Sequence, residues 1–124
     1  MQKVNLDEKL ASFSDHWSPK IVGELNGQQV KLVKFQGEFV WHHHEQEDEM
    51  FLVVLGSFRM DYREDGGAEK ALEVGQGEFV IVPRGTVHRP VADREVQVLL
   101  LEPAGTLNTG NVGSARTVEK LQRI

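Results

Sequence analysis

Short segments of alternating apolar and polar residues, separated by glycine and proline, fill the chain from residue 19 to residue 101. In one of them Phe58, Met60 and Tyr62 alternate with charged residues, which is typical of a strand with one buried face. Asn26-Gly27 favours a tight turn between the first two segments. Strands at this spacing, with no helix between them, predict an all-β antiparallel sandwich or barrel. The expected strands are residues 21–25, 30–35, 38–44, 49–55, 58–63, 71–74, 79–82, 87–91 and 96–101.

The two ends of the chain lack this alternation. Asn5, followed three residues later by Glu8, resembles a capping box, and the apolar residues that follow have helical spacing. We therefore expect a short helix over residues 6–13. Residues 103–124 are rich in glycine and asparagine, which predicts a loop-rich tail. A length of 124 residues is enough for one hydrophobic core, so we expect a single domain, 1–124.

Composition excludes several classes of protein. The formal net charge of −5 argues against nucleic acid or an anionic membrane surface as the main partner. Without cysteine the chain has no disulfide framework and no thiolate site. The first residues lack the apolar core of a signal peptide, and the longest apolar run, Met50 to Leu55, is far too short for a membrane span. We therefore expect a soluble cytoplasmic protein.

Four residues have the chemistry and spacing of a metal site: His42, His44, Glu49 and His88. If 38–44 is a strand, His42 and His44 point to one face and His43 to the other. Imidazole nitrogens with a carboxylate suit Fe, Mn, Ni, Zn or Cu, so we expect one divalent transition metal as cofactor. Four protein ligands leave positions for water, oxygen or a chelating substrate. The alternative, two exposed strand histidines beside an unrelated glutamate, does not account for His88.

The same residues form two motifs that resemble those of a known family. The first, at 37–56, has two histidines one residue apart, then four residues, glutamate, six residues and glycine. The second, at 77–92, has glycine, five residues, proline, one residue, glycine, two residues and histidine. Ala92 stands where asparagine is common. Together the motifs resemble the small single-domain cupins described as mannose-6-phosphate-isomerase-like. The resemblance implies a jelly-roll β-barrel, a double-stranded β-helix, with a metal site, but no particular reaction.

The remaining polar and aromatic residues near the motifs are expected to have structural roles. The acidic residues of 45–48 favour a solvated loop. Arg84 and Arg89 flank His88 and are expected to form salt bridges with the acidic surface, while Trp41 shares the parity of His43 and is expected to pack outside the barrel. Ile21–Leu25 can cover an exposed sheet edge of a partner. We therefore expect a homodimer.

The pocket around the metal is expected to be apolar, which bears on the reaction. The residues expected to face inward are Val40, Phe51, Val53, Phe58, Met60, Phe79 and Ile81. Such walls favour small or oxygen-like ligands and disfavour sugar-phosphate isomerisation, which needs proton shuttles and phosphate anchors. The leading hypothesis is a metal-dependent enzyme of oxygenase, isomerase or lyase type that acts on a small molecule. The alternative is a non-catalytic, metal-dependent module that binds or senses a small ligand.

Overall fold

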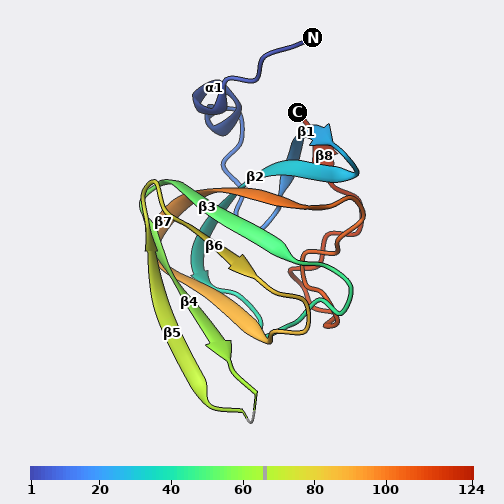
Figure 1. Ribbon diagram of the computed structural model, residues 1–124. Helices are drawn as coiled ribbons and strands as arrows, with labels where there is room; N and C mark the ends of the chain where they lie inside the picture. The colour runs from blue at the N-terminus through green and yellow to red at the C-terminus, as the bar shows by residue number, and fades with distance from the viewer. Residues whose placement is uncertain (66) are drawn as a thin grey trace.

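The computed structural model describes residues 1–65 and 67–124, which form one short helix and eight strands (Figure 1). In chain order the elements are α1 (Leu6–Ala11), β1 (Lys20–Leu25), β2 (Gln28–Glu38), β3 (Glu49–Leu55), β4 (Ser57–Arg63), β5 (Glu69–Gly75), β6 (Phe79–Val82), β7 (His88–Pro103) and β8 (Gln122–Arg123). The strands pair in the order β5-β4-β7-β2-β1-β8, and β3 pairs with both β6 and β7. The predicted all-β fold is confirmed. The expected turn at 65–67 includes residue 66, which lies outside the described residues.

Helix α1 begins where the sequence predicts and ends two residues early. The Asn5 side chain accepts a hydrogen bond from the Glu8 backbone N–H at 3.0 Å, as expected for an N-cap. At the other end, the buried Lys34 ammonium donates to the carbonyls of Leu10 and Phe13 at 2.7 and 2.6 Å. Lys34 thereby satisfies carbonyls that a helix end leaves free. No helix in the described ranges is long and apolar enough to cross a bilayer.

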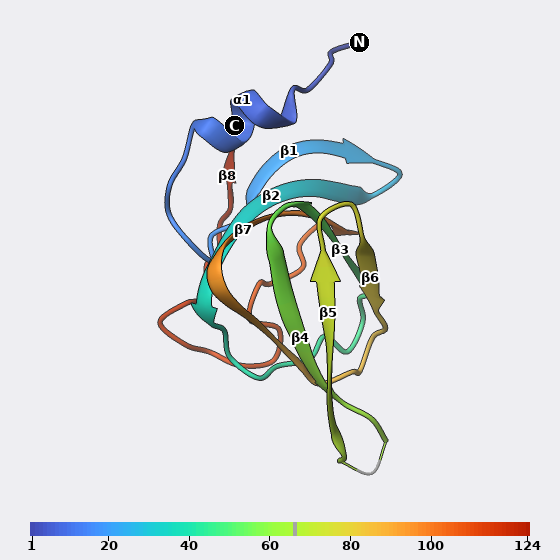
Figure 2. The ribbon, with the colours of Figure 1, turned by 90° about the vertical axis from the view of Figure 1, so that its left-hand side faces the viewer.

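Strand β7 organises the barrel. Two predicted strands, 87–91 and 96–101, merge into this one strand, which pairs with β4 near its start and with β2 and β3 further on. Figures 1 and 2 show that β7 bends sharply, so its two ends lie on the same side of the molecule. The same views place α1 and both termini at one end and the tip of the β4–β5 hairpin at the other. Residues far apart in sequence therefore meet near the ends of β7.

The predicted strand 38–44 is wrong. Strand β2 ends at Glu38, after a register shift between Phe35 and Gly37, and Gly37 has a positive φ of 87°. The chain then continues to β3 as an extended loop that contacts β7 at single points, one of them a bridge between His42 and His88. Gly37 tolerates this left-handed conformation at no steric cost, which allows the strand to turn away.

The core lies between the inward faces of the strands, and four of the expected inward residues are buried there, namely Phe51, Val53, Phe58 and Met60. Val40 packs against this core from the loop. The prediction for Phe79 and Ile81 is wrong: their side chains are 59% and 56% exposed. In the β3–β6 register their neighbours Val80 and Val82 stand opposite the inward-facing Phe51 and Glu49, so β6 has the opposite parity to the one expected.

Candidate metal centre

His42, His44, Glu49 and His88 converge in the barrel interior, and one potential ligand atom from each lies within 4.8 Å of the others. All four side chains are buried. His42 and His44 come from the loop after β2, Glu49 begins β3, and His88 begins β7. The structure thus brings together every residue that the two motifs single out.

Backbone hydrogen bonds hold the histidine loop in place. The N–H of His42 donates to the carbonyl of His88 at 3.0 Å, and the N–H of His88 donates to the carbonyl of His42 at 2.9 Å. Gly85 N–H donates to the carbonyl of His44 at 2.7 Å. His43 points away, with a side chain that is 25% exposed and 3.5 Å from Glu45 Oε1. The side chains of residues 42–44 therefore alternate in direction as in a strand, although these residues lie in an extended loop that is hydrogen-bonded to residues 85–88.

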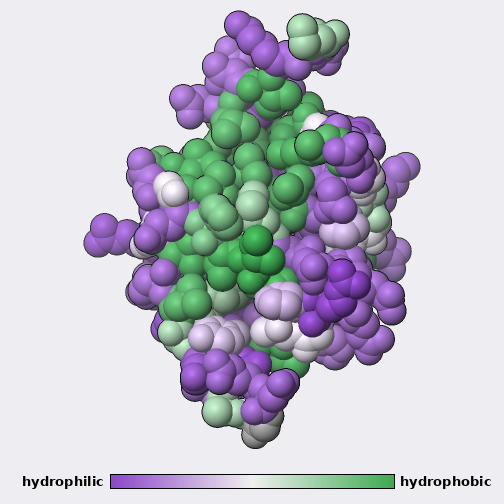
Figure 3. Space-filling model, viewed as in Figure 1, coloured by the Kyte–Doolittle hydropathy of each residue, from purple (hydrophilic) through white to green (hydrophobic). Residues whose placement is uncertain are grey.

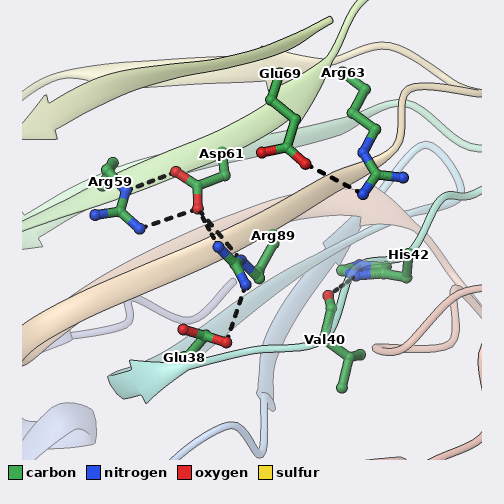
Figure 4. Close-up of polar contacts among 8 residues, drawn as sticks. All are labelled: Glu38, Val40, His42, Arg59, Asp61, Arg63, Glu69 and Arg89. Atoms are coloured by element: carbon green, nitrogen blue, oxygen red, sulfur yellow. Dashed lines mark hydrogen bonds and ion pairs between the residues drawn. The ribbon is translucent and has the colours of Figure 1, made fainter. Parts of the chain in front are cut away.

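Two of the imidazole rings are oriented by backbone carbonyls. His42 Nδ1 lies 2.9 Å from the carbonyl of Val40 (Figure 4), and His88 Nδ1 lies 2.8 Å from the carbonyl of Thr86. A carbonyl oxygen only accepts, so each Nδ1 carries the hydrogen. The Nε2 lone pair of each ring then remains free, as in metal-binding histidines oriented by such outer contacts.

Several atoms at the centre of the cluster lack hydrogen bonds. Within the described part of the chain, both ring nitrogens of His44, Oε1 of Glu49 and Nε2 of His88 are buried without a partner. Glu49 Oε1 lies 2.8 Å from His44 Nε2 and 3.4 Å from His88 Nε2, but these contacts lack hydrogen-bond geometry. A buried polar group left unsatisfied costs about 1–3 kcal/mol. Nitrogen and carboxylate donors aimed at one point fit a divalent transition metal, so this cluster can hold one.

The electrostatics of the cluster favour the forms that bind metals. Burial, followed by the charge of His88, lowers the pKa of His42 to about 3, so its imidazole is neutral. Burial acts to raise the pKa of Glu49, but the neighbouring Glu102 carboxyl and the imidazoles of His44 and His88 outweigh it and hold that pKa well below the ordinary value. A neutral imidazole and an ionised carboxylate are the protonation states that ligate metal.

Two charged residues in the barrel interior were missed by the sequence analysis. Lys31 and Glu102 are 1% and 2% exposed, and Lys31 Nζ lies 2.7 Å from Glu102 Oε1. Burial and the neighbouring Glu49 raise the pKa of Glu102 well above its ordinary value. The expectation of an almost wholly apolar interior is therefore wrong. Strand alternation could have identified both residues. Lys31 lies two residues from the buried Val33, and Glu102 lies two residues from the buried Leu100, so each faces inward.

The C-terminal tail also contributes to the site. The Asn111 side chain accepts from the N–H of His43 at 2.9 Å, and the Asn111 N–H donates to the carbonyl of His43 at 3.1 Å. A Cβ at Gly110 would lie 2.2 Å from the His43 carbonyl oxygen, so only glycine fits there. Residues 103–124 are loop-rich, as predicted, but nothing in their composition indicated this contact.

The flanking arginines form the predicted salt bridges. Arg84 binds Asp48 at 3.2 Å, and Arg89 binds Glu38 and Asp61 at 3.0 and 2.8 Å (Figure 4). Trp41 lies under two guanidinium groups, with Arg89 at 4.8 Å and Arg63 at 4.4 Å from its ring. These contacts hold the outer side of the histidine loop against β4 and β7.

Two cavities lie near the cluster. A small one of about 30 Å³ contains His42, Glu49 and Glu102 in its wall. Its other lining residues are mostly aromatic or aliphatic, including Trp17, Phe35, Phe39 and Phe51. An open cleft of about 860 Å³ lies between the β4–β5 hairpin and β6, and two of its lining residues pair with cluster residues: Val82 with Glu49, and Tyr62 with His88.

Comparisons with known proteins agree with this fold. The uncharacterized protein YdbB of Bacillus subtilis (strain 168) is 34% identical over 82 residues, which cover 66% of this chain and 63% of that protein. A cupin-2 domain containing protein from Shewanella frigidimarina is 37% identical, with a TM-score of 0.75 over 81% of this chain and 93% of its own. Hydroquinone 1,2-dioxygenase PnpCD in complex with Fe³⁺ has a TM-score of 0.74 at 15% identity, over 84% of this chain and 33% of its own, which shows likeness of fold alone.

The family assignment follows from the extent of the match. Residues 30–102, more than half of the chain, match Cupin_2, the cupin domain. That range contains all four residues of the cluster and both buried charges beside it. The chain belongs to the cupin family.

Proposed function

We propose that this cupin is a metal-dependent enzyme acting on a small molecule, with His42, His44, Glu49 and His88 binding one divalent transition metal. The observation that carries the proposal is the convergence of buried, unsatisfied nitrogen and oxygen atoms at one point. In the structure these atoms form no hydrogen bond with any described residue. A bound ion supplies Lewis-acid chemistry, or redox chemistry if it is iron or manganese.

The surroundings of the cluster favour oxygenase-type chemistry over the isomerase and lyase types. The cavity of about 30 Å³ beside His42 and Glu49 has room for about two water molecules, and its walls are mostly aromatic. That space suits a diatomic ligand. The larger cleft has space for a small organic molecule, and its lining residues Val82 and Tyr62 pair with Glu49 and His88. The likeness to hydroquinone dioxygenase concerns the fold alone, so phenols serve only as first probes of the site and are not assigned as its substrate.

The second candidate is a non-catalytic module whose metal orients or senses a small ligand. The larger cleft favours this candidate, because none of the four cluster residues belongs to its lining. In this case the metal binds and a ligand binds, but no product forms. The two candidates therefore differ in turnover and not in metal affinity.

The test begins with metal analysis of protein purified without chelators or a nickel column. Metal-free protein is then loaded separately with Fe²⁺, Mn²⁺, Ni²⁺, Zn²⁺ or Cu²⁺, and oxygen uptake is measured with a panel of small phenols. Oxygen uptake that requires both metal and phenol supports the proposed enzyme. Metal binding without oxygen uptake or product favours the second candidate, and failure to bind any of the five metals overturns both.

We propose also that the chain forms a homodimer through the outer face of β3, β6 and β7. Figure 3 shows a broad hydrophobic area on this side of the molecule. It contains the exposed Phe79 and Ile81, which pair with the outward-facing Leu52 and Met50, and Leu99 adjoins Leu52 on β7. None of these residues is charged, so two copies that each carry a net charge of −5 can meet there without opposing carboxylates. The edge of β1, proposed from sequence, is partly paired with β8.

Light scattering tests this assembly. The natural chain should have twice the 14.0 kDa mass of one chain at micromolar concentration. Phe79→Glu should return the mass to that of one chain, because it places two carboxylates within a self-complementary apolar contact. Val4→Glu, at another exposed apolar position, is the matched control and should remain dimeric. A natural chain that is monomeric would overturn the proposal.

A further inference from the structure

The buried pair of Lys31 and Glu102 is difficult to explain by stability. Both side chains are almost completely removed from water, with Nζ and Oε1 2.7 Å apart. The desolvation of a buried ammonium and carboxyl commonly cancels their attraction, and apolar residues of similar volume often serve as well or better. A buried lysine and glutamate at this position therefore require another explanation.

Strand register places the pair directly behind one member of the metal cluster. In the β3–β7 ladder Met50 stands opposite Leu101, so the next step along both strands brings Glu49 opposite Glu102. Lys31 reaches Glu102 from β2, where its backbone stands opposite Leu100. Strand β3 thus carries the Glu49 carboxylate of the cluster, β7 carries the Glu102 carboxyl behind it, and β2 carries the Lys31 ammonium that contacts Glu102.

The arrangement fixes one oxygen of Glu102. Oε1 accepts a hydrogen bond from Lys31, and the carboxyl lines the same cavity as that of Glu49, close enough for each to shift the pKa of the other. The other oxygen, Oε2, is buried and accepts no hydrogen bond from any described residue. Glu102 also lines the small cavity together with Glu49 and His42. The carboxyl of Glu102 is therefore held on one side and faces the cluster on the other.

We propose that Glu102, anchored by Lys31, is a positioning residue that sets the orientation of the Glu49 carboxylate for metal binding. The inference rests on the proposed metal site and goes beyond it. Outer-shell partners of this kind typically change metal affinity by about 10–100-fold when removed. Two buried polar side chains thus stand behind one ligand, Glu49, in addition to the carbonyls that orient His42 and His88.

The test measures the affinity for Co²⁺ by calorimetric titration of metal-free protein, with the visible spectrum of the bound ion as a second readout. The double variant Lys31→Met, Glu102→Leu removes both polar groups without leaving either one buried alone. We expect its affinity to fall about 10–100-fold and its cobalt spectrum to change, while the melting temperature of the metal-free form stays near that of the natural chain. Glu102→Gln should stay within about threefold, because an amide can donate to Glu49 and accept from Lys31.

Val98→Ala is the matched control, since Val98 is fully buried on the same face of β7. It should lower the melting temperature and leave the affinity for Co²⁺ unchanged. Unchanged affinity and spectrum in the double variant would overturn the inference while the natural chain still binds Co²⁺. If the double variant does not fold, the single variant Lys31→Met provides the test. A loss of Co²⁺ affinity of at least about threefold supports the inference, and an affinity equal to that of the natural chain overturns it. A natural chain that binds neither Co²⁺ nor any of Fe²⁺, Mn²⁺, Ni²⁺, Zn²⁺ and Cu²⁺ would overturn the proposed function and this inference with it.

Discussion

The two halves of the barrel interior are built from the same strands but contain opposite kinds of residue. One half is apolar, with Val33, Val53, Phe58 and Val98 almost inaccessible to water. The other half contains three histidines, two glutamates and a lysine, all buried. Buried apolar groups stabilise a fold, whereas buried ionisable groups cost free energy unless they are satisfied. The apolar half therefore stabilises the barrel, whereas the polar half costs stability and serves binding.

The largest effect should come from removing a ligand in the polar half. His44→Ala and His88→Ala each delete a buried nitrogen that has no other partner, so we expect metal content to fall from near one ion per chain to near none. His43→Ala is the control, because His43 lies on the opposite side of the loop and should leave metal content unchanged. Inductively coupled plasma mass spectrometry measures all three. Equal loss in all three variants would contradict the assignment.

A substitution in the apolar half should lower the stability of the fold and leave metal binding nearly unchanged. Phe58 is almost fully buried and its ring contacts those of Phe35 and Phe51. Phe58→Ala should lower the free energy of unfolding by about 3–5 kcal/mol, as cavity-forming core substitutions do. Denaturant unfolding measures this loss, and metal titration at low temperature should give an affinity close to that of the natural chain. A large loss of metal affinity with little loss of stability would contradict the separate roles of the two halves.

A smaller effect is expected from acid on the metal-free protein. The pKa of His42 is about 3 in the folded state and about 6.5 in the unfolded chain, so the unfolded state binds more protons as pH falls below 6.5. His42 should therefore lower the free energy of unfolding by about 2 kcal/mol between pH 7 and about pH 5. Glu102, with its raised pKa, acts with the opposite sign in this range.

The contribution of His42 is isolated by a pair of variants. Denaturant unfolding at both pH values should show a weaker fall in stability towards acid for His42→Gln than for the natural chain. His43→Gln, which changes a partly exposed ring that lies near Glu45 and points away from the cluster, should behave like the natural chain. An identical pH dependence in all three proteins would show that His42 is not buried in its neutral form.

The sequence predicted much of the apolar half and only part of the polar half. Alternation placed Phe51, Val53, Phe58 and Met60 correctly, because these residues lie in the middle of regular strands. It misplaced Phe79 and Ile81, since β6 has only four residues and both of its faces are apolar. A short apolar run does not reveal which face is inward.

The cluster residues were identifiable because their types and spacing are distinctive, although the loop that carries His42 and His44 is not the strand predicted. Lys31 and Glu102 were missed because charged residues are rarely fully buried unless paired, and pairing depends on strand register. The contact between Asn111 and His43 joins segments 68 residues apart and follows from no local pattern. Contacts of this kind depend on how distant strands and loops meet.

Thermal unfolding of the metal-free protein, with and without added metal, tests most directly whether the polar half is a metal site within a barrel that folds by itself. The apolar half predicts a cooperative transition without metal and a folded chain at 25 °C. Addition of Fe²⁺, Mn²⁺, Ni²⁺, Zn²⁺ or Cu²⁺ at about 100 times its dissociation constant should add about 2.7 kcal/mol and raise the melting temperature by roughly 10 °C. A metal-free chain that is unfolded at 25 °C, or a melting temperature that none of the five metals changes, would contradict the account.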